Sequence, residues 1–177
     1  LDVGGHEMSH GVVQNTANLK YENESGALNE SFADIFGAMI DRDDWKMGED
    51  VVIKSFFPSG ALRDLSNPHN GGTSRSQIYF QPNHVSEQYK GTEDNGGVHI
   101  NSGIPNYAYY LFVQELKKIR TEEESKKIAE RVFYHTLTNF LTRSSVFKDL
   151  RIGVEKSSVD LYSGTPDVLV SARRAFD

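Results

Sequence analysis

Apolar and small residues recur every three to four positions along most of this chain, whereas the strict alternation of apolar and polar residues that marks a half-buried strand is scarce. This spacing predicts a mainly α-helical fold. At 177 residues the chain is long enough to form one domain with its own core. We expect helices at about 2–15, 27–40, 104–119, from 121 onward, 145–161 and 167–176.

Two of these helices begin at a recognisable cap. Asp2 stands where its carboxylate can accept amide hydrogens of the first turn, so we expect it to cap the first helix. Thr121-x-x-Glu124 is a capping-box pattern and the clearest helix start in the chain. Between the helices, the stretch 41–97 is rich in Pro, Gly, Ser and Asn and lacks periodicity. It predicts a long irregular loop region, which in a compact domain is usually functional.

The amino-acid composition limits which ligands could hold a metal and which partners the chain could have. The chain has no cysteine, so a bound metal must be held by the six histidines or the twenty-five acids. A net charge of -6 without a Lys/Arg cluster argues against a nucleic-acid surface. No apolar run approaches the ~20 residues of a membrane-spanning helix. The first residues include neither an initiator Met nor a signal stretch, and we interpret the chain as a fragment or a processed product.

The first expected helix contains the pattern H-E-x-x-H. His6 and His10 lie one helical turn apart on one face, so both imidazoles can reach one tetrahedral ion. Glu7 projects beside that ion and can take a proton from its bound water as a general base. Alone, five residues are weak support, since an amphipathic helix with two surface histidines gives the same pattern.

The second expected helix supplies what such a site still needs. A catalytic zinc has three protein ligands and one open position, and Glu30 follows His10 by twenty residues on a separate helix. Asp34, one turn further on, is placed to accept the other ring N–H of His6, and Asn29 could orient His10 in the same way. The alternative is a solvated acidic helix face, which the preceding H-E-x-x-H disfavours.

Two long segments carry a family resemblance. The segment 6–37 and the segment 91–103, which reads GTEDNGGVHINSG, resemble the thermolysin family of neutral zinc metallopeptidases, and the similarity continues to the Ala-Phe-Asp ending. It spans nearly the whole chain. Metzincins are disfavoured because Val13 and Thr16 stand where that group has Gly and a third His.

The resemblance implies an architecture and a set of roles. Residues 1–177 would be the helical, zinc-binding C-terminal domain, with the N-terminal half of the cleft not present. His99 and Tyr21 would stabilise the oxyanion formed when water attacks a peptide bond, and Asp94 would orient His99. Arg63 matches a family arginine that hydrogen-bonds the substrate backbone.

Other positions follow from the same resemblance. Leu62 and Val3 would line an apolar pocket for the substrate residue after the cleaved bond. In the family, the connection after the second helix holds a paired calcium site. Here that loop is shorter and carries a lysine, so we expect one calcium ion rather than two. The candidate calcium ligands are Asp2, Asp41, Asp44 and Glu49. The three remaining histidines match nothing in the family and are expected to be ordinary surface or packing residues, at His69, His84 and His135.

Two classes of function remain open at this point. The first is a zinc endopeptidase acting on a peptide or protein substrate, with an aminopeptidase of the same class as a weaker reading. The second is a metal-stabilised binding or structural domain without turnover of its own. Family members are typically secreted as zymogens, which implies a prosegment and an N-terminal domain as partners and an extracellular location.

Overall fold

The structure is a computed structural model, and it describes residues 1–53, 55–57, 59–71 and 80–177. Most of these residues are helical, so the expected mainly α fold is confirmed. The longer helices are α1 (Asp2–Gln14), α2 (Asn23–Ile40), α3 (Glu93–Asn101), α4 (Gly103–Lys117), α5 (Glu122–Asn139), α6 (Phe147–Tyr162) and α7 (Pro166–Ala175). The shorter elements are β1 (Lys46–Met47), β2 (Arg63–Asp64) and the 3-10 helices η1 (Pro68–Gly71) and η2 (Val85–Glu87).

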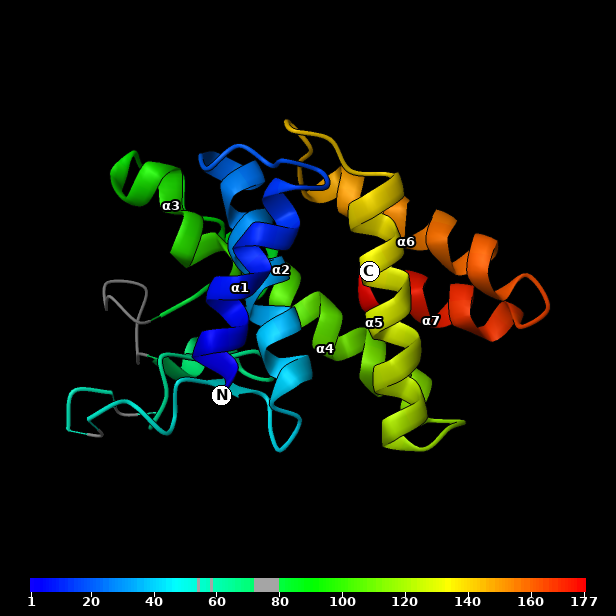
Figure 1. Ribbon diagram of the computed structural model, residues 1–177, viewed down its shortest axis with the longest axis horizontal. Coiled ribbons are helices and arrows are strands. Elements are labelled where there is room, and N and C mark those ends of the chain that lie inside the picture. The colour runs from blue at the N-terminus through cyan, green and yellow to red at the C-terminus, as the bar shows by residue number, and fades with distance from the viewer. Residues whose placement is uncertain (54, 58, 72–79) are drawn as a thin grey trace.

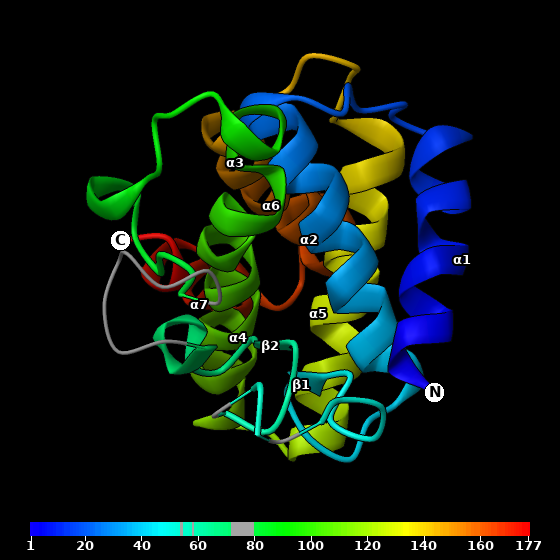
Figure 2. The ribbon, with the colours of Figure 1, turned by 90° about the vertical axis from the view of Figure 1, so that its left-hand side faces the viewer.

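Helix α2 is the central element. It packs against α1 on one side and against α3 and α4 on another, while α5, α6 and α7 complete the bundle (Figure 1). Figure 2 shows α1 lying along the outside of α2, with α4 on the opposite side of α2. Because it is surrounded in this way, almost all of α2 from Ser25 to Met39 is buried, polar residues included.

Glycines allow α1 and α2 to approach closely. A Cβ atom added at Gly5 would lie 2.8 Å from Cδ1 of Ile40 and 3.2 Å from Cα of Gly37. A Cβ atom at Gly37 would lie 2.7 Å from the carbonyl oxygen of Asp2. Any larger residue would therefore separate the two helices that carry the expected metal ligands.

An aromatic cluster forms the centre of the core. Phe133 of α5 packs edge-on against Tyr109 of α4 at a ring-centroid distance of 4.8 Å and lies 6.0 Å from Phe32 of α2. Phe112 lies beside them, and all four rings are fully buried. This cluster joins α2, α4 and α5, so the helix that carries Glu30 is fixed from behind by the largest core side chains.

Several expected boundaries are wrong. Asp2 does not cap the first helix: it is the first helical residue, its carboxylate accepts the N–H of Gly48, and the N-cap position is Leu1. The second helix begins at Asn23 rather than at 27. Ser25 and a glycine have low helix propensity, but tertiary contacts hold this turn, including the bond from Ser25 Oγ to the carbonyl of Ser145 at 2.8 Å.

Other helix starts differ less. The capping box is confirmed, since Glu124 N–H donates to Thr121 Oγ1 at 3.3 Å and Thr121 N–H donates to Glu124 Oε2 at 3.1 Å. Helix α6 begins at Phe147 rather than at 145, because the Ser145 hydroxyl instead accepts the N–H of Thr142 in the preceding turn.

The stretch 41–97 is largely irregular, as expected, but it contains short elements that the sequence did not predict. Strands β1 and β2 pair antiparallel, with Lys46 opposite Asp64 and Met47 opposite Arg63. Two residues per strand are too few to show an alternating pattern. None of the helices in the described part of the chain has the length and apolar character needed to cross a membrane.

Candidate metal centre

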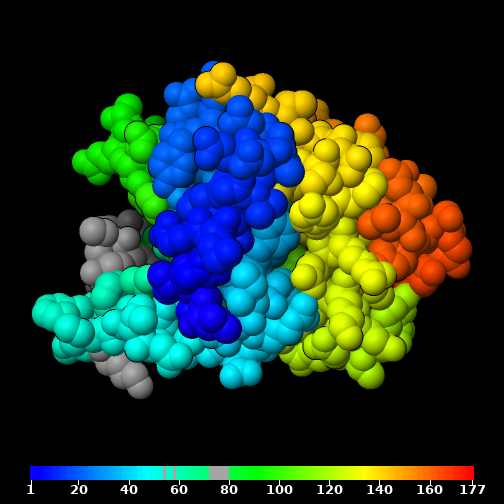
Figure 3. All heavy atoms as spheres, in the orientation of Figure 1, coloured from blue at the N-terminus to red at the C-terminus, as the bar shows by residue number. Residues whose placement is uncertain are grey.

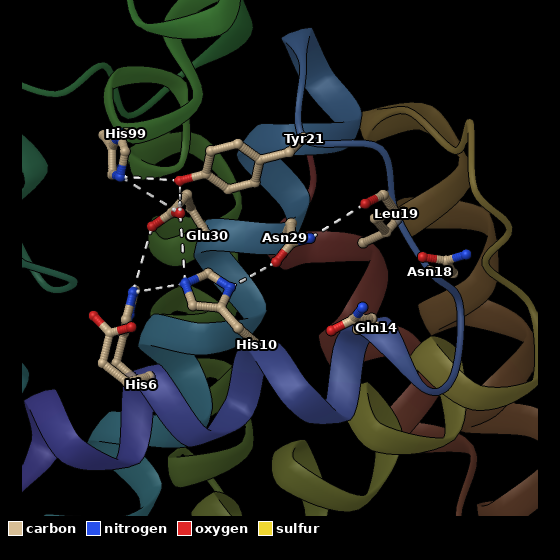
Figure 4. Close-up of a pocket in the computed structure, with 10 residues that line it drawn as sticks. His6, His10, Gln14, Asn18, Leu19, Tyr21, Asn29, Glu30 and His99 are labelled. Carbon is tan, nitrogen blue, oxygen red and sulfur yellow. Dashed lines mark hydrogen bonds and ion pairs between the residues drawn. The ribbon is translucent and has the colours of Figure 1, made fainter.

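The side chains of three predicted ligands meet where α1 faces α2 (Figure 4). His6 Nε2 and His10 Nε2 lie 3.1 Å apart on adjacent turns of α1. From α2, the carboxylate of Glu30 approaches both rings: Oε2 is 3.5 Å from His6 Nε2 and Oε1 is 3.6 Å from His10 Nε2. Three potential ligand atoms from two rigid helices thus surround one point.

These separations fit a tetrahedral zinc ion. Zinc binds histidine nitrogen and carboxylate oxygen at about 2.0–2.2 Å, so ligand atoms of a tetrahedral site lie about 3.3–3.6 Å from one another. Both separations between Glu30 and a histidine fall in this range, and the two histidine nitrogens, at 3.1 Å, are slightly closer. Glu30 is 1% exposed, and its Oε2 atom makes no hydrogen bond to any described residue. A buried carboxylate oxygen without a donor is costly unless a cation accompanies it. The residues present therefore suit zinc in both geometry and charge.

Each histidine is oriented through its second ring nitrogen. His6 Nδ1 lies 2.8 Å from Asp34 Oδ1, and His10 Nδ1 lies 2.8 Å from Asn29 Oδ1. The Asn29 amide is fixed in turn, because its nitrogen donates to the carbonyl of Leu19 at 3.2 Å. In both rings Nδ1 is the donor, which leaves the lone pair on Nε2 directed toward Glu30.

Asp34 also joins the metal centre to β2. Arg63 donates to its carboxylate from Nε at 2.8 Å and from a terminal nitrogen at 2.6 Å, and Asn106 donates at 2.9 Å. Burial alone would raise the pKa of Asp34, but the charge of Arg63 and the bond from His6 hold that pKa below its usual range. Asp34 is therefore a carboxylate that anchors His6.

Tyr21 and His99 face the ligands from the other side. The Tyr21 hydroxyl donates to Glu30 and lies 3.1 Å from His99 Nε2. Burial, together with the bond to Glu30, raises the pKa of Tyr21 above its usual value, so the hydroxyl keeps its proton. Asp94 accepts from His99 twice, from Nδ1 at 2.7 Å and from the backbone N–H at 2.8 Å.

An unusual turn places Asp94 and His99 together. Asp94, Asn95, Gly96 and Gly97 all have positive φ, from 52° to 84°, so the chain makes one left-handed turn within the segment assigned to α3. Two of the four residues are glycines and one is asparagine, the residues that tolerate this conformation best. The helical stretch that carries His99 begins only after this turn.

A cavity of about 480 Å³ opens beside His6, His10 and Glu30. Glu7, which is exposed, projects from α1 into its wall. The lining residues are His6, Glu7, His10, Gln14, Asn18, Leu19, Tyr21, Asn29, Glu30 and His99. Val3, Leu62 and Arg63, which were predicted to contact substrate, are not among them. Arg63 directs its guanidinium to Asp34, and Leu62 packs over Gly48.

Comparison with known proteins identifies the family of this chain. The family model described as the thermolysin metallopeptidase, alpha-helical domain, matches residues 17–177. The chain belongs to the thermolysin family. A bacillolysin of Brevibacillus brevis is 42% identical over 179 positions, which cover 100% of this chain and 32% of that protein. An extracellular elastase of Staphylococcus epidermidis is 43% identical, covering 91% of this chain and 28% of that protein.

A solved structure agrees with this assignment. The precursor of protealysin, a metalloproteinase from Serratia proteamaculans, matches 98% of this chain and 56% of its own with a TM-score of 0.80 and 29% identity. The chain thus spans about a third of the bacillolysin and about half of the protealysin precursor. The residues 6–10 precede the segment that the family model matches, but the alignment with the bacillolysin covers the whole chain.

Three of the four predicted calcium ligands come together. Potential ligand atoms of Asp2, Asp41 and Glu49 all lie within 4.8 Å of one another. Asp44 is not part of this group, and its carboxylate accepts the N–H of Lys46 at 2.7 Å, at the start of β1. Asp2, Asp41 and Glu49 are therefore the grouped candidates for calcium in this member of the thermolysin family, and the part of Asp44 stays a prediction.

The remaining histidines lie away from the metal centre. His69 stacks on Phe80 at a centroid distance of 4.5 Å, and His84 accepts from the N–H of Ser86 at 3.2 Å at the start of η2. His135 contacts the hydroxyl of Ser157 at 3.1 Å. Packing or local capping accounts for each.

Sequence reasoning missed residues that support the site from elsewhere in the fold. Asn106 reaches Asp34 from α4, across 72 positions of sequence. Gln81 donates to the carbonyl of His99 at 2.6 Å and is 5% exposed. Neither belongs to a pattern of spacing with the residue it contacts, so only the folded chain shows these contacts.

Proposed function

We propose that this chain is the zinc-carrying half of a metalloendopeptidase. The observation that carries the proposal is the convergence of His6, His10 and Glu30 at tetrahedral separations, with Glu7 beside them in an open cavity. Zinc, when bound there, would act as a Lewis acid toward a peptide carbonyl and would make water a nucleophile at neutral pH. Three protein ligands leave the fourth position free, which is typical of catalytic rather than structural zinc.

The residues around that position would have different roles in the reaction. Glu7 is in reach of the cavity from the same helix and would take the proton of the attacking water and later deliver it to the leaving amine. Tyr21 and His99 present donors on the opposite side, where an oxyanion would develop. Asp94 accepts a hydrogen bond from His99 Nδ1 and would orient the imidazole toward the cavity.

The roles of the remaining predicted residues follow from their contacts. Arg63, bonded to Asp34, would stabilise the His6 side of the site, and any bond to a substrate backbone would use donors that Asp34 leaves free. We propose that Val3 and Leu62 take part in substrate binding only together with further protein, because neither lines the cavity of this chain. Asp2, Asp41 and Glu49 would bind a single calcium ion.

A second candidate is a metal-binding domain that does not turn over substrate by itself. It is favoured by one observation: the chain spans about a third of the length of the bacillolysin that it matches. The relatives' names, which include an extracellular elastase and the precursor of protealysin, support a secreted protein made with a prosegment. If this chain is part of such a longer protein, an N-terminal domain would form the other wall of the cleft.

Zinc stoichiometry tests the centre without reference to activity. Elemental analysis of the purified chain should give one zinc per chain, and Glu30→Ala should lose it because two imidazoles alone bind weakly. The matched control is Glu22→Ala, an exposed acid near the start of the same helix. Chains without zinc after incubation with the metal would contradict the proposal.

Hydrolysis is tested separately. Glu7→Gln should retain one zinc per chain but lose peptide cleavage in a full-length enzyme that contains this domain, since the amide cannot accept the proton. Persistent cleavage in that variant would remove Glu7 from the mechanism and leave the zinc site standing.

A further inference from the structure

The cavity at the metal centre has two chemically different ends. On the His6 side lies the ion pair of Asp34 with Arg63, which closes the site against β2. On the His10 side the cavity continues past the ligands to Gln14 and Asn18. Figure 4 shows both of these side chains beyond His10, away from His6 and His99.

The side-chain amide of Asn29 already makes hydrogen bonds within the protein, whereas the amides of Gln14 and Asn18 make none among the described residues. Asn29 uses its oxygen on His10 and its nitrogen on the carbonyl of Leu19. Within the described residues, the side chains of Gln14 and Asn18 make no hydrogen bond to the protein, and both residues are exposed. Each offers one acceptor and two donor hydrogens to a molecule in the cavity.

The backbone fixes where these two amides stand. Gln14 is the last residue of α1 and lies one turn beyond His10, so it shares the face that presents the histidines. Asn18 has a φ of 51°, and its N–H donates to the carbonyl of Val13 at 2.8 Å, which reverses the chain after the helix. The end of α1 therefore fixes the backbone position of both residues beside the cavity.

We propose that Gln14 and Asn18 form a subsite that selects a hydrogen-bonding side chain, such as that of Asn, Gln, Ser or Thr, in the peptide residue on the His10 side of the metal. The inference rests on the proposed peptidase function. A substrate amide or hydroxyl in this subsite would replace the hydrogen bonds that Gln14 and Asn18 make to water. An apolar side chain would displace that water without replacing its hydrogen bonds.

Peptide hydroxamates test this subsite through binding. The hydroxamate group is placed at either end of a short peptide, and the adjacent residue is Asn or Leu. Calorimetry on the zinc-loaded chain should show, for one of the two orientations, about tenfold tighter binding of the Asn peptide, as one or two hydrogen bonds would give. The variant Gln14→Ala/Asn18→Gly should abolish that ratio, and glycine at 18 keeps the positive φ.

The control is Asn15→Ala, which removes an exposed amide that bonds to the carbonyl of Gly11 and lies outside the cavity lining. It should leave the ratio unchanged. Equal binding of both peptides in both orientations, or a ratio that survives the double variant, would overturn the subsite and leave the metal centre intact. A chain that binds neither zinc nor any hydroxamate would overturn the proposed function and this inference with it.

Discussion

At the scale of single residues, Asp34 connects the metal centre to the rest of the molecule. Its fully buried carboxylate contacts His6, Arg63 and Asn106, which come from three different elements. A carboxylate at this depth is tolerated because every contact is a donor and one of them is a cation. Its role in orienting His6 and its role in stability are therefore carried by the same atoms.

Asp34→Ala is expected to destabilise the fold by about 3–5 kcal/mol, because the largely buried guanidinium of Arg63 would lose its partner. Urea unfolding of the metal-free chain measures the change. The paired variant Asp34→Leu/Arg63→Met should recover much of the loss, since no charge is then left unpaired. A double variant as unstable as Asp34→Ala would mean that packing, rather than the unpaired charge, causes the effect.

Asn29 allows orientation to be separated from stability. Asn29→Ala removes the bond that fixes the His10 ring, and such outer partners typically change metal affinity by about 10–100-fold. Competition with a chelator should show this loss for zinc. Asn29→Asp, which keeps an oxygen for His10 Nδ1, should bind zinc more tightly than Asn29→Ala, and equal affinities would show that ring orientation is set elsewhere.

At the scale of elements, the left-handed turn at 94–97 determines where His99 lies. Gly96 has a φ of 84°, and a Cβ atom there would collide with the side-chain oxygen of Asn23, which belongs to the start of α2. The turn is thus both conformationally restricted and closely packed. A change at this position should move Asp94 and His99 relative to Tyr21.

Gly96→Ala should reduce stability by at least about 1 kcal/mol, the usual minimum for a side chain forced into positive φ. In a full-length enzyme it should also lower kcat with one zinc per chain retained, because the ligands are on other helices. Asn95→Gly is the matched control, since glycine keeps the positive φ of 52° without strain. Unchanged kcat in Gly96→Ala would place His99 outside the reaction.

The capping box of α5 gives a prediction with a pH dependence. Hydrogen bonds from the hydroxyl and N–H of Thr121 lower the pKa of Glu124 in the folded chain. Their contribution to stability is therefore present above the usual glutamate pKa of about 4.3 and is lost as the pH falls through the lowered value. Thr121→Ala should cost about 0.5–2 kcal/mol at pH 7.

Urea unfolding at a series of pH values measures this cost, which should shrink below about pH 4 as Glu124 takes up a proton. Thr138→Ala, near the other end of the same helix, is the control. A cost for Thr121→Ala that stays constant down to pH 3 would show that the carboxylate bond adds nothing to the cap.

At the scale of the whole molecule, the cavity is lined by residues of α1, α2 and α3 and of the segment between α1 and α2. Figure 3 shows α1, in dark blue, on the face of the molecule toward the viewer, and its Leu1 and Met8 side chains are about three-quarters exposed. The chain covers 32% of the Brevibacillus brevis bacillolysin and 56% of the protealysin precursor. We propose that positioning of a peptide depends on protein beyond this chain.

We expect the 177-residue chain alone to bind zinc yet to cleave casein poorly. Correct positioning of the substrate can lower the barrier by about 7–11 kcal/mol, and a cleft with only one wall would lose much of this effect. Cleavage by the purified chain before and after EDTA measures this. Strong, EDTA-sensitive cleavage would show that the helical half positions substrate unaided, and a catalytically silent Glu7→Gln chain provides the background.

The sequence anticipated the metal centre better than the loops. Local rules were sufficient for the histidines, because an interval of four on a helix fixes their relation within a single element. The start of α2 was misplaced, since Ser25 and Gly26 favour a turn locally and only contacts with Ser145 and Val98 make that segment helical. Strands of two residues left no periodic signal at all.

The sequence by itself determined the helical class of the fold, the spacing of His6 and His10 and, through its resemblance, the family. Only the tertiary structure decided that the acid from α2 arrives at tetrahedral distance, that Arg63 is directed to Asp34 rather than into the cavity, and that Gln14 keeps a free amide there. The physical reason is that relations within a helix depend on backbone geometry, whereas relations between helices depend on close packing of residues far apart in the chain.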